Sequence, residues 1–387
     1  MIFSILIYVS TIAARSYVHP GTAIPPDRVD SLKNPGAIYS PALSQLDTTL
    51  TFDTVAISTD VDKPSRAIAK YYTDGTQMEF RIDGDRAYRF TIAYLVNPSK
   101  KEYANAAQRL INDWATKCKS FSGPNAPPES GWGLAGMAKS AELLKYKYPE
   151  WSKNTEADFK RFVKDILMPN LKQYETTPWI RAGNWGSTII QARLQFAIFA
   201  EDDAEMAFAE SEAYKITDRL LDRTKFNGNE WNKDPSHNIV IGHNAESKRD
   251  LAHAAFEIGG LVDIAETLKN QKSQVDLYGY RSNILKAGVE YQARLILGDY
   301  PEDIKPWIAT LSGEEYKKWI GGWFPHPMNW EMAVNHYTKR EGQSMPRTKQ
   351  LLTAGVIHPL QKRRTRCRPE LFLYGIGLSS VTHLKPS

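Results

Sequence analysis

Repeated amphipathic helix patterns between residues 103 and 297 set the fold class of this chain. Strand-like alternation is rare, and turn signals such as "SGPNAPPESG" separate the helical segments. Consecutive helices pack on their neighbours, so a run of this kind forms an open solenoid or a closed toroid. No repeat of fixed period is visible, which favours the toroid. We predict an all-α fold, an α/α toroid that forms an incomplete helical barrel. Its helical segments are residues 103–118, 134–146, 155–171, 184–200, 204–221, 246–268 and 283–297.

The character of the sequence divides the chain into four parts. Residues 15–85 are mixed and rich in Pro, Asp and Thr, which predicts a short irregular N-terminal arm packed on the toroid. Residues 86–350 carry the helical patterns and form the predicted toroid domain. Residues 351–387 form a tail whose basic run "KRRTRC" is either a solvated segment or a binding patch.

The first 14 residues read as a secretory signal peptide. "MIFSILIYVSTIAA" is an apolar run that ends in small residues, although it lacks the usual positive start; a short buried strand is the alternative. It is too short to span a bilayer, and no later segment is long enough, so we expect a secreted, extracellular protein without a membrane span. Two cysteines, Cys118 and Cys367, fit either one disulfide or two buried thiols.

The formal net charge of +5 and the pI near 8.9 mildly favour an acidic partner such as a polyanion. Nothing in the chain matches a nucleic-acid-binding module, so we expect no nucleic acid partner. The sequence carries no signal for the oligomeric state.

The segment "ESKRDLAHAAFEIGGLVDIAETL" (246–268) has an unusual polar face. One narrow stripe is apolar and predicts contact with a neighbouring helix; it consists of Leu251, Ala254, Ala255, Ile258, Val262 and Ala265. The opposite face carries Arg249, His253, Phe256 and Gly260 where an ordinary solvent face would carry Lys and Glu. An inner helix of a toroid has this distribution, with functional side chains toward the cavity; a plain exposed face is the alternative.

Two further segments concentrate polar and aromatic side chains. "WFPHPMNWEMAVNHYTKREG" (323–342) holds a dense group that suits a cleft, or else an interface loop: His326, Trp330, Glu331, His336, Tyr337 and Arg340. "RAGNWGS" (181–187) places Asn184 and Trp185 at a helix start, where Asn is also a good N-cap. Six of the eight histidines fall between residues 237 and 358, but no HExxH pattern is present and the cysteines are far apart. We therefore expect no metal and no other cofactor.

Taken together, three segments resemble the alginate lyase domain superfamily of polysaccharide lyases over residues 86–350. They are "NWGSTIIQARLQFAIFAED", "ESKRDLAHAAFEIGGLVDIAETLKNQ" with the following "DLYGY", and "NWEMAVNHYTKREGQSMPRT". The resemblance implies an α/α toroid that cleaves an anionic polysaccharide, alginate or glucuronan, by β-elimination. Alginate, the commoner substrate of this family, is the expected substrate, in its mannuronate-rich form.

The chemistry of elimination explains these residue types. The C5 proton of a uronate is weakly acidic until the neighbouring carboxylate is neutralised by an amide, His or Arg. A base then takes the proton and an acid protonates the leaving O4. The resemblance assigns neutralisation to Asn184 and Arg249, and assistance or base chemistry to His253.

The remaining roles follow from a departure in the pattern. Some helical alginate lyases carry a catalytic tyrosine seven residues after the arginine, where this chain has Phe256. The expected base and acid therefore moves to Tyr337, with Tyr278 or His253 as alternatives. The expected substrate-binding residues are Trp185, Trp330, Glu331, His336 and Arg340.

Two other functions remain open at this level. A glycoside hydrolase on the same fold would need two carboxylates, for which Glu246, Asp250 and Glu331 are candidates. A non-catalytic polysaccharide binder would stack sugars on Trp185, Trp323 and Trp330, and the phenylalanine at position 256 is consistent with it.

Overall fold

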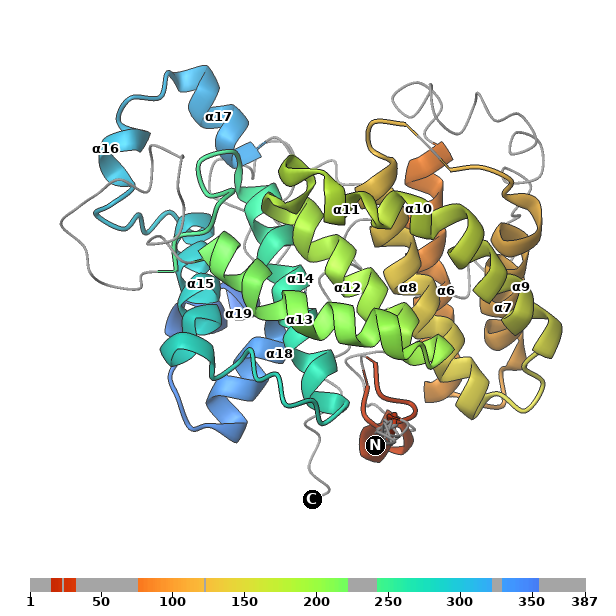
Figure 1. Cartoon of the computed structure of the whole chain (residues 1–387). Helices are drawn as coiled ribbons and strands as arrows, with labels where there is room; N and C mark the ends of the chain where they lie inside the picture. Colours follow the sequence, from red (N-terminus) through yellow and green to blue (C-terminus); the bar gives the residue numbers. More distant parts are fainter. Residues whose placement is uncertain are drawn as a thin grey trace, which may run out of the picture.

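The computed structural model describes residues 15–22, 24–32, 76–121, 123–221, 242–321 and 329–354. Within these ranges the regular structure is helical and no β-strand occurs (Figure 1). The longer helices are α6 (Thr76–Val96), α7 (Lys101–Lys117), α8 (Ala126–Lys147), α9 (Lys153–Phe162), α12 (Gly183–Ala200), α13 (Asp203–Leu221), α14 (Leu251–Asn270), α15 (Tyr280–Leu297), α17 (Gly313–Gly321) and α19 (Pro346–Ala354). The short elements are α1 (Pro26–Val29), η1 (Asp30–Leu32), the π-turns η2 (Val163–Leu167) and η6 (Asn335–Arg340), α10 (Met168–Leu171), α11 (Gln173–Thr176), η3 (Pro178–Arg181), α16 (Lys305–Ile308) and α18 (Trp330–Val334).

The helices form two layers, as an α/α toroid requires. Helices α6, α8, α12 and α14 contact one another in sequence and make one layer, while α7, α9, α13 and α15 make the other (Figure 1). Along the sequence, a second-layer helix separates each two consecutive first-layer helices. The chain therefore returns through the second layer each time, and the four first-layer helices run in the same direction. The all-α toroid predicted from the helix patterns is thereby confirmed. The predicted boundary between residues 85 and 86 falls inside α6, which begins the toroid at Thr76.

Small residues let neighbouring first-layer helices approach closely. A side chain at Gly84 of α6 would meet the carbonyl oxygen of Gly133 in α8 at 2.3 Å. A side chain at Gly260 of α14 would meet Ser187 Oγ in α12 at 2.8 Å. The sequence placed Gly260 on the face predicted to look toward the cavity; in the structure this position faces Ser187 of the adjacent helix.

Buried polar contacts tie the middle of this layer together. The Asp263 carboxylate of α14 is fully buried and forms an ion pair with Lys139 of α8. It also accepts a hydrogen bond from Gln195 of α12 at 3.2 Å. A buried carboxylate is stable only with such partners, so these contacts fix three helices relative to one another.

The predicted buried stripe of α14 is confirmed, since all its residues are at most 2% exposed: Leu251, Ala254, Ala255, Ile258, Val262 and Ala265. The helix begins later than predicted, at Leu251, because Asp250 caps it by accepting a hydrogen bond from the backbone N–H of His253. Residues 245–249 form a turn that leads into it.

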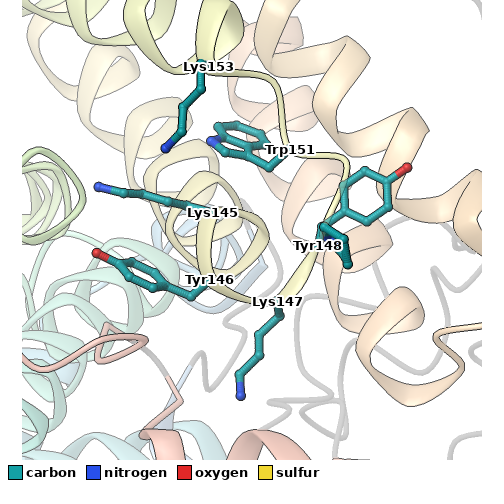
Figure 2. A pocket seen from close by; sticks show the side chains of 7 residues that line it. Lys145, Tyr146, Lys147, Tyr148, Trp151 and Lys153 are labelled. Carbon is teal, nitrogen blue, oxygen red and sulfur yellow. The ribbon is translucent and has the colours of Figure 1, made fainter.

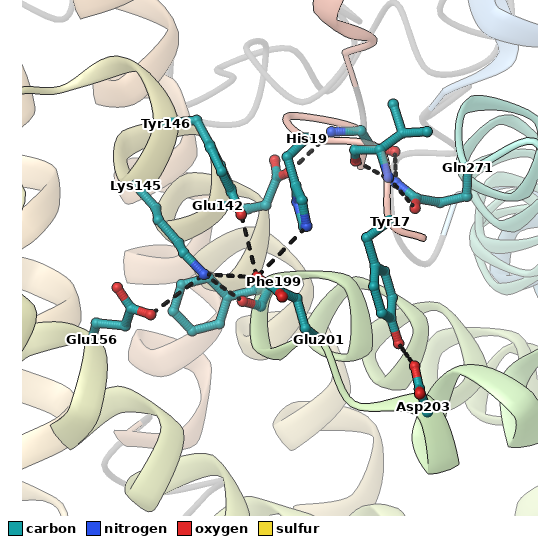
Figure 3. A network of polar contacts seen from close by, with 12 residues as sticks. Tyr17, His19, Glu142, Lys145, Tyr146, Glu156, Phe199, Glu201, Asp203 and Gln271 are labelled. Atoms are coloured by element: carbon teal, nitrogen blue, oxygen red, sulfur yellow. Dashed lines mark hydrogen bonds and ion pairs between the residues drawn. The ribbon is translucent and has the colours of Figure 1, made fainter. Parts of the chain in front are cut away.

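The first described residues, 15–22, cross the end of the toroid where α8, α12 and α14 finish (Figure 3). Arg15 forms two hydrogen bonds with Glu210, of 2.8 and 2.7 Å. His19 Nδ1 lies 3.1 Å from Glu142, and Gln271 binds the backbone of Val18. This segment therefore packs on the toroid as an arm. The predicted signal peptide (1–14) lies outside the described residues. The predicted tail (351–387) does so from residue 355 on, while its first four residues end α19.

Candidate functional site

The first part of the site is the pair formed by Asp250 and His253 at the start of α14. The Asp250 carboxylate caps the helix through Oδ1 at 2.8 Å and contacts His253 Nδ1 through Oδ2 at 2.5 Å. A carboxylate on Nδ1 holds the proton there and leaves Nε2 as the basic nitrogen. Burial alone would raise the pKa of Asp250, but its bonds to His253 hold that pKa below its usual value. Asp250 is therefore an anion that orients the imidazole.

A pocket of about 410 Å³ surrounds this pair. Its volume falls in the range typical of ligand pockets. Cationic and aromatic side chains dominate its wall; the lining residues are Lys248, Arg249, Asp250, His253, Trp307, Leu311, Glu315, Lys318 and Trp319. The wall thus combines a candidate base with positive charge and flat apolar rings, which is the set of groups that an acidic sugar requires.

Arg249 and Asn184 converge on a carboxylate of the protein itself. Glu246 Oε1 accepts hydrogen bonds from the Asn184 backbone N–H at 3.2 Å and from Nδ2 at 2.9 Å. Arg249 Nη1 lies 3.3 Å from the same oxygen. The Glu246 carboxylate therefore sits at the N-terminal end of α12, where the helix dipole favours an anion.

This geometry corrects the role that the sequence suggested for Asn184. Its side chain is fully buried and its amide nitrogen already donates to Glu246. An amide in that position orients Glu246 and, through it, Arg249, and does not reach a substrate carboxylate. Arg249 remains available, because it lines the pocket and about half of its side chain is exposed.

A carboxyl group that the sequence did not single out lies beneath this cluster. Glu257 is completely buried, and neither of its oxygens has a hydrogen-bond partner among the described residues. Burial, and then the charge of Glu246, raise its pKa well above the usual value. The neutral form of Glu257 is therefore favoured, because it avoids a second buried charge beside Glu246.

The predicted residues Tyr337, His336 and Arg340 form a separate cluster. Arg340 binds Glu266 near the end of α14, at 2.8 and 3.1 Å, and the His336 ring stacks on Tyr278 at 3.7 Å. Glu266 and His253 are 13 residues apart on α14, which separates them by about 20 Å along the helix axis. The expectation that Tyr337 and His253 share one site is wrong for this structure.

The chemistry of this second cluster is also unfavourable for proton transfer. Tyr337 is fully buried and its hydroxyl donates to the Tyr278 carbonyl at 2.8 Å; burial raises its pKa further above the usual value. Burial, with the nearby charge of Arg340, lowers the pKa of His336 to about 4. Tyr337 and His336 are therefore neutral at pH 7 and packed into the core, where they stabilise the fold around η6.

The other predicted binding residues are divided between the two regions. Trp330 is fully buried at the start of α18, and burial raises the pKa of its neighbour Glu331 to about 7. Trp185 is partly exposed at the start of α12 and lies 5.2 Å from Trp179, whose side chain is 61% exposed. Trp185 thus lies at the same end of the helix layer as His253, whereas Trp330 is a core residue. His326 and Trp323 lie outside the described residues.

A second pocket, of about 260 Å³, lies at the other end of the layer, where α8 finishes (Figure 2). Lysines and aromatic rings line it, but the lysine charges are already paired. Lys145 lies 3.4 Å from Glu156 and 3.3 Å from Glu201, and Lys153 lies 3.4 Å from Glu156. Because its wall also lacks histidine and carboxylate, we assign the candidate active site to the pocket at His253.

Among the described residues, no group of three or more His, Cys, Asp or Glu side chains is arranged to hold a metal ion. None of the helices in the described ranges has the length and apolar character needed to cross a bilayer. Cys118 is a buried free thiol in these ranges, while Cys367 lies outside them.

Sequence and structure comparisons give the chain its relatives. The chain matches the alginate lyase family model over residues 60–299, which is 240 of its 387 residues. No curated protein matches it.

Among solved structures, alginate lyase A1-III from Sphingomonas species A1 is 13% identical, with 84% of this chain and 92% of that chain covered and a TM-score of 0.49. A variant of A1-III complexed with a tetrasaccharide is 14% identical, with 95% and 99% covered and a TM-score of 0.49. An alginate lyase from Bacteroides ovatus is 13% identical, with 85% and 98% covered and a TM-score of 0.49. Because the family match spans more than half of its length, the chain belongs to the alginate lyase family of polysaccharide lyases.

Proposed function

We propose that this protein cleaves alginate by β-elimination in the pocket at the start of α14, with mannuronate-rich chains as its preferred substrate. The observation that carries the proposal is the Asp250–His253 pair, held at 2.5 Å in a pocket lined by Lys248 and Arg249. Family membership supports the reaction class, and the pocket supports the assignment of residues to its steps.

The reaction begins with the substrate carboxylate. Arg249 stabilises the negative charge that develops on it as the C5–H bond breaks. The Arg249 guanidinium can bind the substrate carboxylate because its contacts with Glu246, at 3.3 and 3.4 Å, are long for hydrogen bonds. His253 Nε2 then removes the C5 proton, and the Asp250 carboxylate stabilises the resulting imidazolium.

The same imidazolium can protonate the leaving O4. The C4–O4 bond breaks, a double bond forms between C4 and C5, and His253 returns to its neutral form. One residue can serve both steps only if the C5 proton and O4 lie on the same face of the sugar. They do so in mannuronate and glucuronate and lie on opposite faces in guluronate. This stereochemistry supports mannuronate-rich alginate as the substrate, with guluronate-rich chains disfavoured.

The proposal is tested by offering the purified protein mannuronate-rich alginate, guluronate-rich alginate and glucuronan. Elimination produces an unsaturated uronate, which absorbs ultraviolet light, and a reducing end; hydrolysis produces only the reducing end. We expect absorbance to rise with mannuronate-rich chains. Reducing ends without absorbance would replace elimination by hydrolysis, and no cleavage together with tight binding would replace it by a non-catalytic role.

We further propose that the protein acts outside the cell. The support is the apolar N-terminal run that ends in small residues near Ala13 and Ala14. Expression of the full-length sequence in a secreting host, followed by mass determination of the exported chain, tests this. Loss of about 14 residues is expected, whereas an intact chain retained in the cell would contradict export.

A further inference from the structure

One wall of the candidate active site comes from a segment beyond the family match. The match ends at residue 299, and α16, α17 and the loop between them supply five lining residues: Trp307, Leu311, Glu315, Lys318 and Trp319. Helix α17 packs on α14, and the indole N–H of Trp319 donates to the Ser247 carbonyl at 2.8 Å. Because Trp319 is only 3% exposed, this contact anchors the segment over the start of α14.

The anchor holds a second tryptophan at the pocket surface. The Trp307 ring packs edge-on against Trp319, with centroids 5.5 Å apart and an interplanar angle of 78°. Lys248 also contacts the Trp307 ring, with its Nζ 5.7 Å from the ring centroid. Trp307 is partly exposed and lines the pocket, so it offers a rigid ring beside a cation.

The charges on this wall favour an anion. Three cations line the pocket, Lys248, Arg249 and Lys318, against the two acids Asp250 and Glu315. Asp250 is engaged by His253, and Glu315 accepts a hydrogen bond from the Ser312 backbone N–H at 2.8 Å in a helix-capping arrangement. Both acids therefore have hydrogen-bond partners inside the protein, and Lys318, which is exposed at the rim, also acts electrostatically on Glu315.

We propose that Trp307, Lys248 and Lys318 form a binding subsite for a uronate unit next to the one that meets His253. The Trp307 ring stacks on the apolar face of the sugar, and the two ammonium groups bind its carboxylate. This inference rests on the proposed function, because it takes a uronate polymer as the ligand. The wall lies beyond residue 299, where the family match ends.

Binding of a purified mannuronate tetramer tests the subsite without relying on turnover. Calorimetry is carried out on His253→Ala, in which the ligand is not consumed, and on the same variant combined with Trp307→Ala, Trp307→Phe, Lys318→Ala or Lys317→Ala. Lys317 is the matched control, because it neighbours Lys318 on α17 but pairs with Glu314 and does not line the pocket.

We expect Trp307→Ala to weaken binding by about tenfold or more, as loss of an aromatic anchor does, and Trp307→Phe to restore most of it. Lys318→Ala should weaken binding and reduce its salt dependence, while Lys317→Ala should change neither. A neutral cello-oligosaccharide of the same length should bind far more weakly.

The subsite is refuted if Trp307→Ala binds like its parent, if Lys317→Ala has the same effect as Lys318→Ala, or if the parent binds no uronate oligomer. Failure of the proposed function is a different result. A wild-type protein that binds the tetramer through Trp307 but produces no unsaturated ends would retain the subsite and lose the elimination reaction.

Discussion

Asp250 is the residue that connects the folding of α14 with the chemistry of the pocket. One carboxylate oxygen caps the helix, and the other orients His253. The sequence pattern Asp-x-x-His contains both functions, because a cap and the third residue after it lie side by side at a helix start. A substitution that preserves capping but removes the charge therefore separates stability from catalysis.

Asp250→Asn should lower the melting temperature less than Asp250→Ala does, since Asn and Asp are comparable N-caps. Its amide cannot stabilise an imidazolium, so we expect kcat to fall by about 10²–10⁴-fold. Asp250→Ala should lose the same activity and about 1 kcal/mol of stability. Wild-type kcat in Asp250→Asn would show that His253 does not depend on this carboxylate.

Asn184 provides a test of the corrected assignment. In Asn184→Ala the Glu246 carboxylate loses one of its donors in a buried site, which should cost about 1–3 kcal/mol of folding free energy. Denaturant unfolding measures this loss. An unchanged unfolding free energy together with a large fall in kcat would instead assign Asn184 to the substrate.

Glu331 gives the stability a predictable pH dependence. Burial raises its pKa to about 7 in the folded state, above the ordinary value of 4.5. The folded protein therefore binds more protons than the unfolded chain between these values, so this group makes stability fall as pH rises from about 4.5 to 7. His336, with its pKa lowered to about 4 by burial, acts in the opposite direction below pH 6.5.

The variant Glu331→Gln isolates the first effect. The difference in unfolding free energy between Glu331→Gln and wild type should shift in favour of the variant as pH rises from 5 to 8. His336 is present in both proteins and cancels in this difference. A difference that stays constant over this range would contradict the raised pKa of Glu331.

At the level of secondary-structure elements, the spacing between α12 and α14 depends on Gly260. Alanine is a better helix former by about 1 kcal/mol, but its Cβ would meet Ser187 at 2.8 Å. We expect the clash to dominate, so Gly260→Ala should lower the melting temperature. Gly313→Ala in α17 is the control, because nothing lies within 4 Å of its added methyl group. Equal melting temperatures for the two variants would show that α12 moves away freely.

The elements also show what sequence patterns can and cannot predict. The apolar stripe of α14 and the partly exposed His253 on its other face follow from helical spacing, which depends only on local geometry. The distance between Tyr337 and His253 cannot be predicted from helical spacing, because it depends on where α18 and η6 pack along α14. The pocket wall formed by α16 and α17 could not be predicted from the sequence either, since short helices rich in tryptophan show little hydrophobic periodicity. The Asp-x-x-His spacing is present in the sequence, but at the sequence level Asp250 was considered only as a candidate carboxylate of a glycoside hydrolase.

At the scale of the whole molecule, the candidate active site and the N-terminal arm lie at opposite ends of the toroid. The pocket lies where α14 begins, and the arm formed by residues 15–22 crosses the layer where α8, α12 and α14 end (Figure 3). The Tyr337 cluster also lies toward the end of α14, with Arg340 on Glu266. The two proposed locations for the base are thus at opposite ends of one helix, and a single comparison decides between them.

That comparison is the rate of ultraviolet absorbance increase on mannuronate-rich alginate for His253→Ala and Tyr337→Phe, with folding of each checked by circular dichroism. We predict that His253→Ala loses activity by at least ~10²-fold. Tyr337→Phe should retain most of its activity, because the Tyr337 hydroxyl donates its hydrogen bond to the buried Tyr278 carbonyl and not to a substrate. A folded Tyr337→Phe without activity, beside an active His253→Ala, would contradict the assignment of the site to the start of α14.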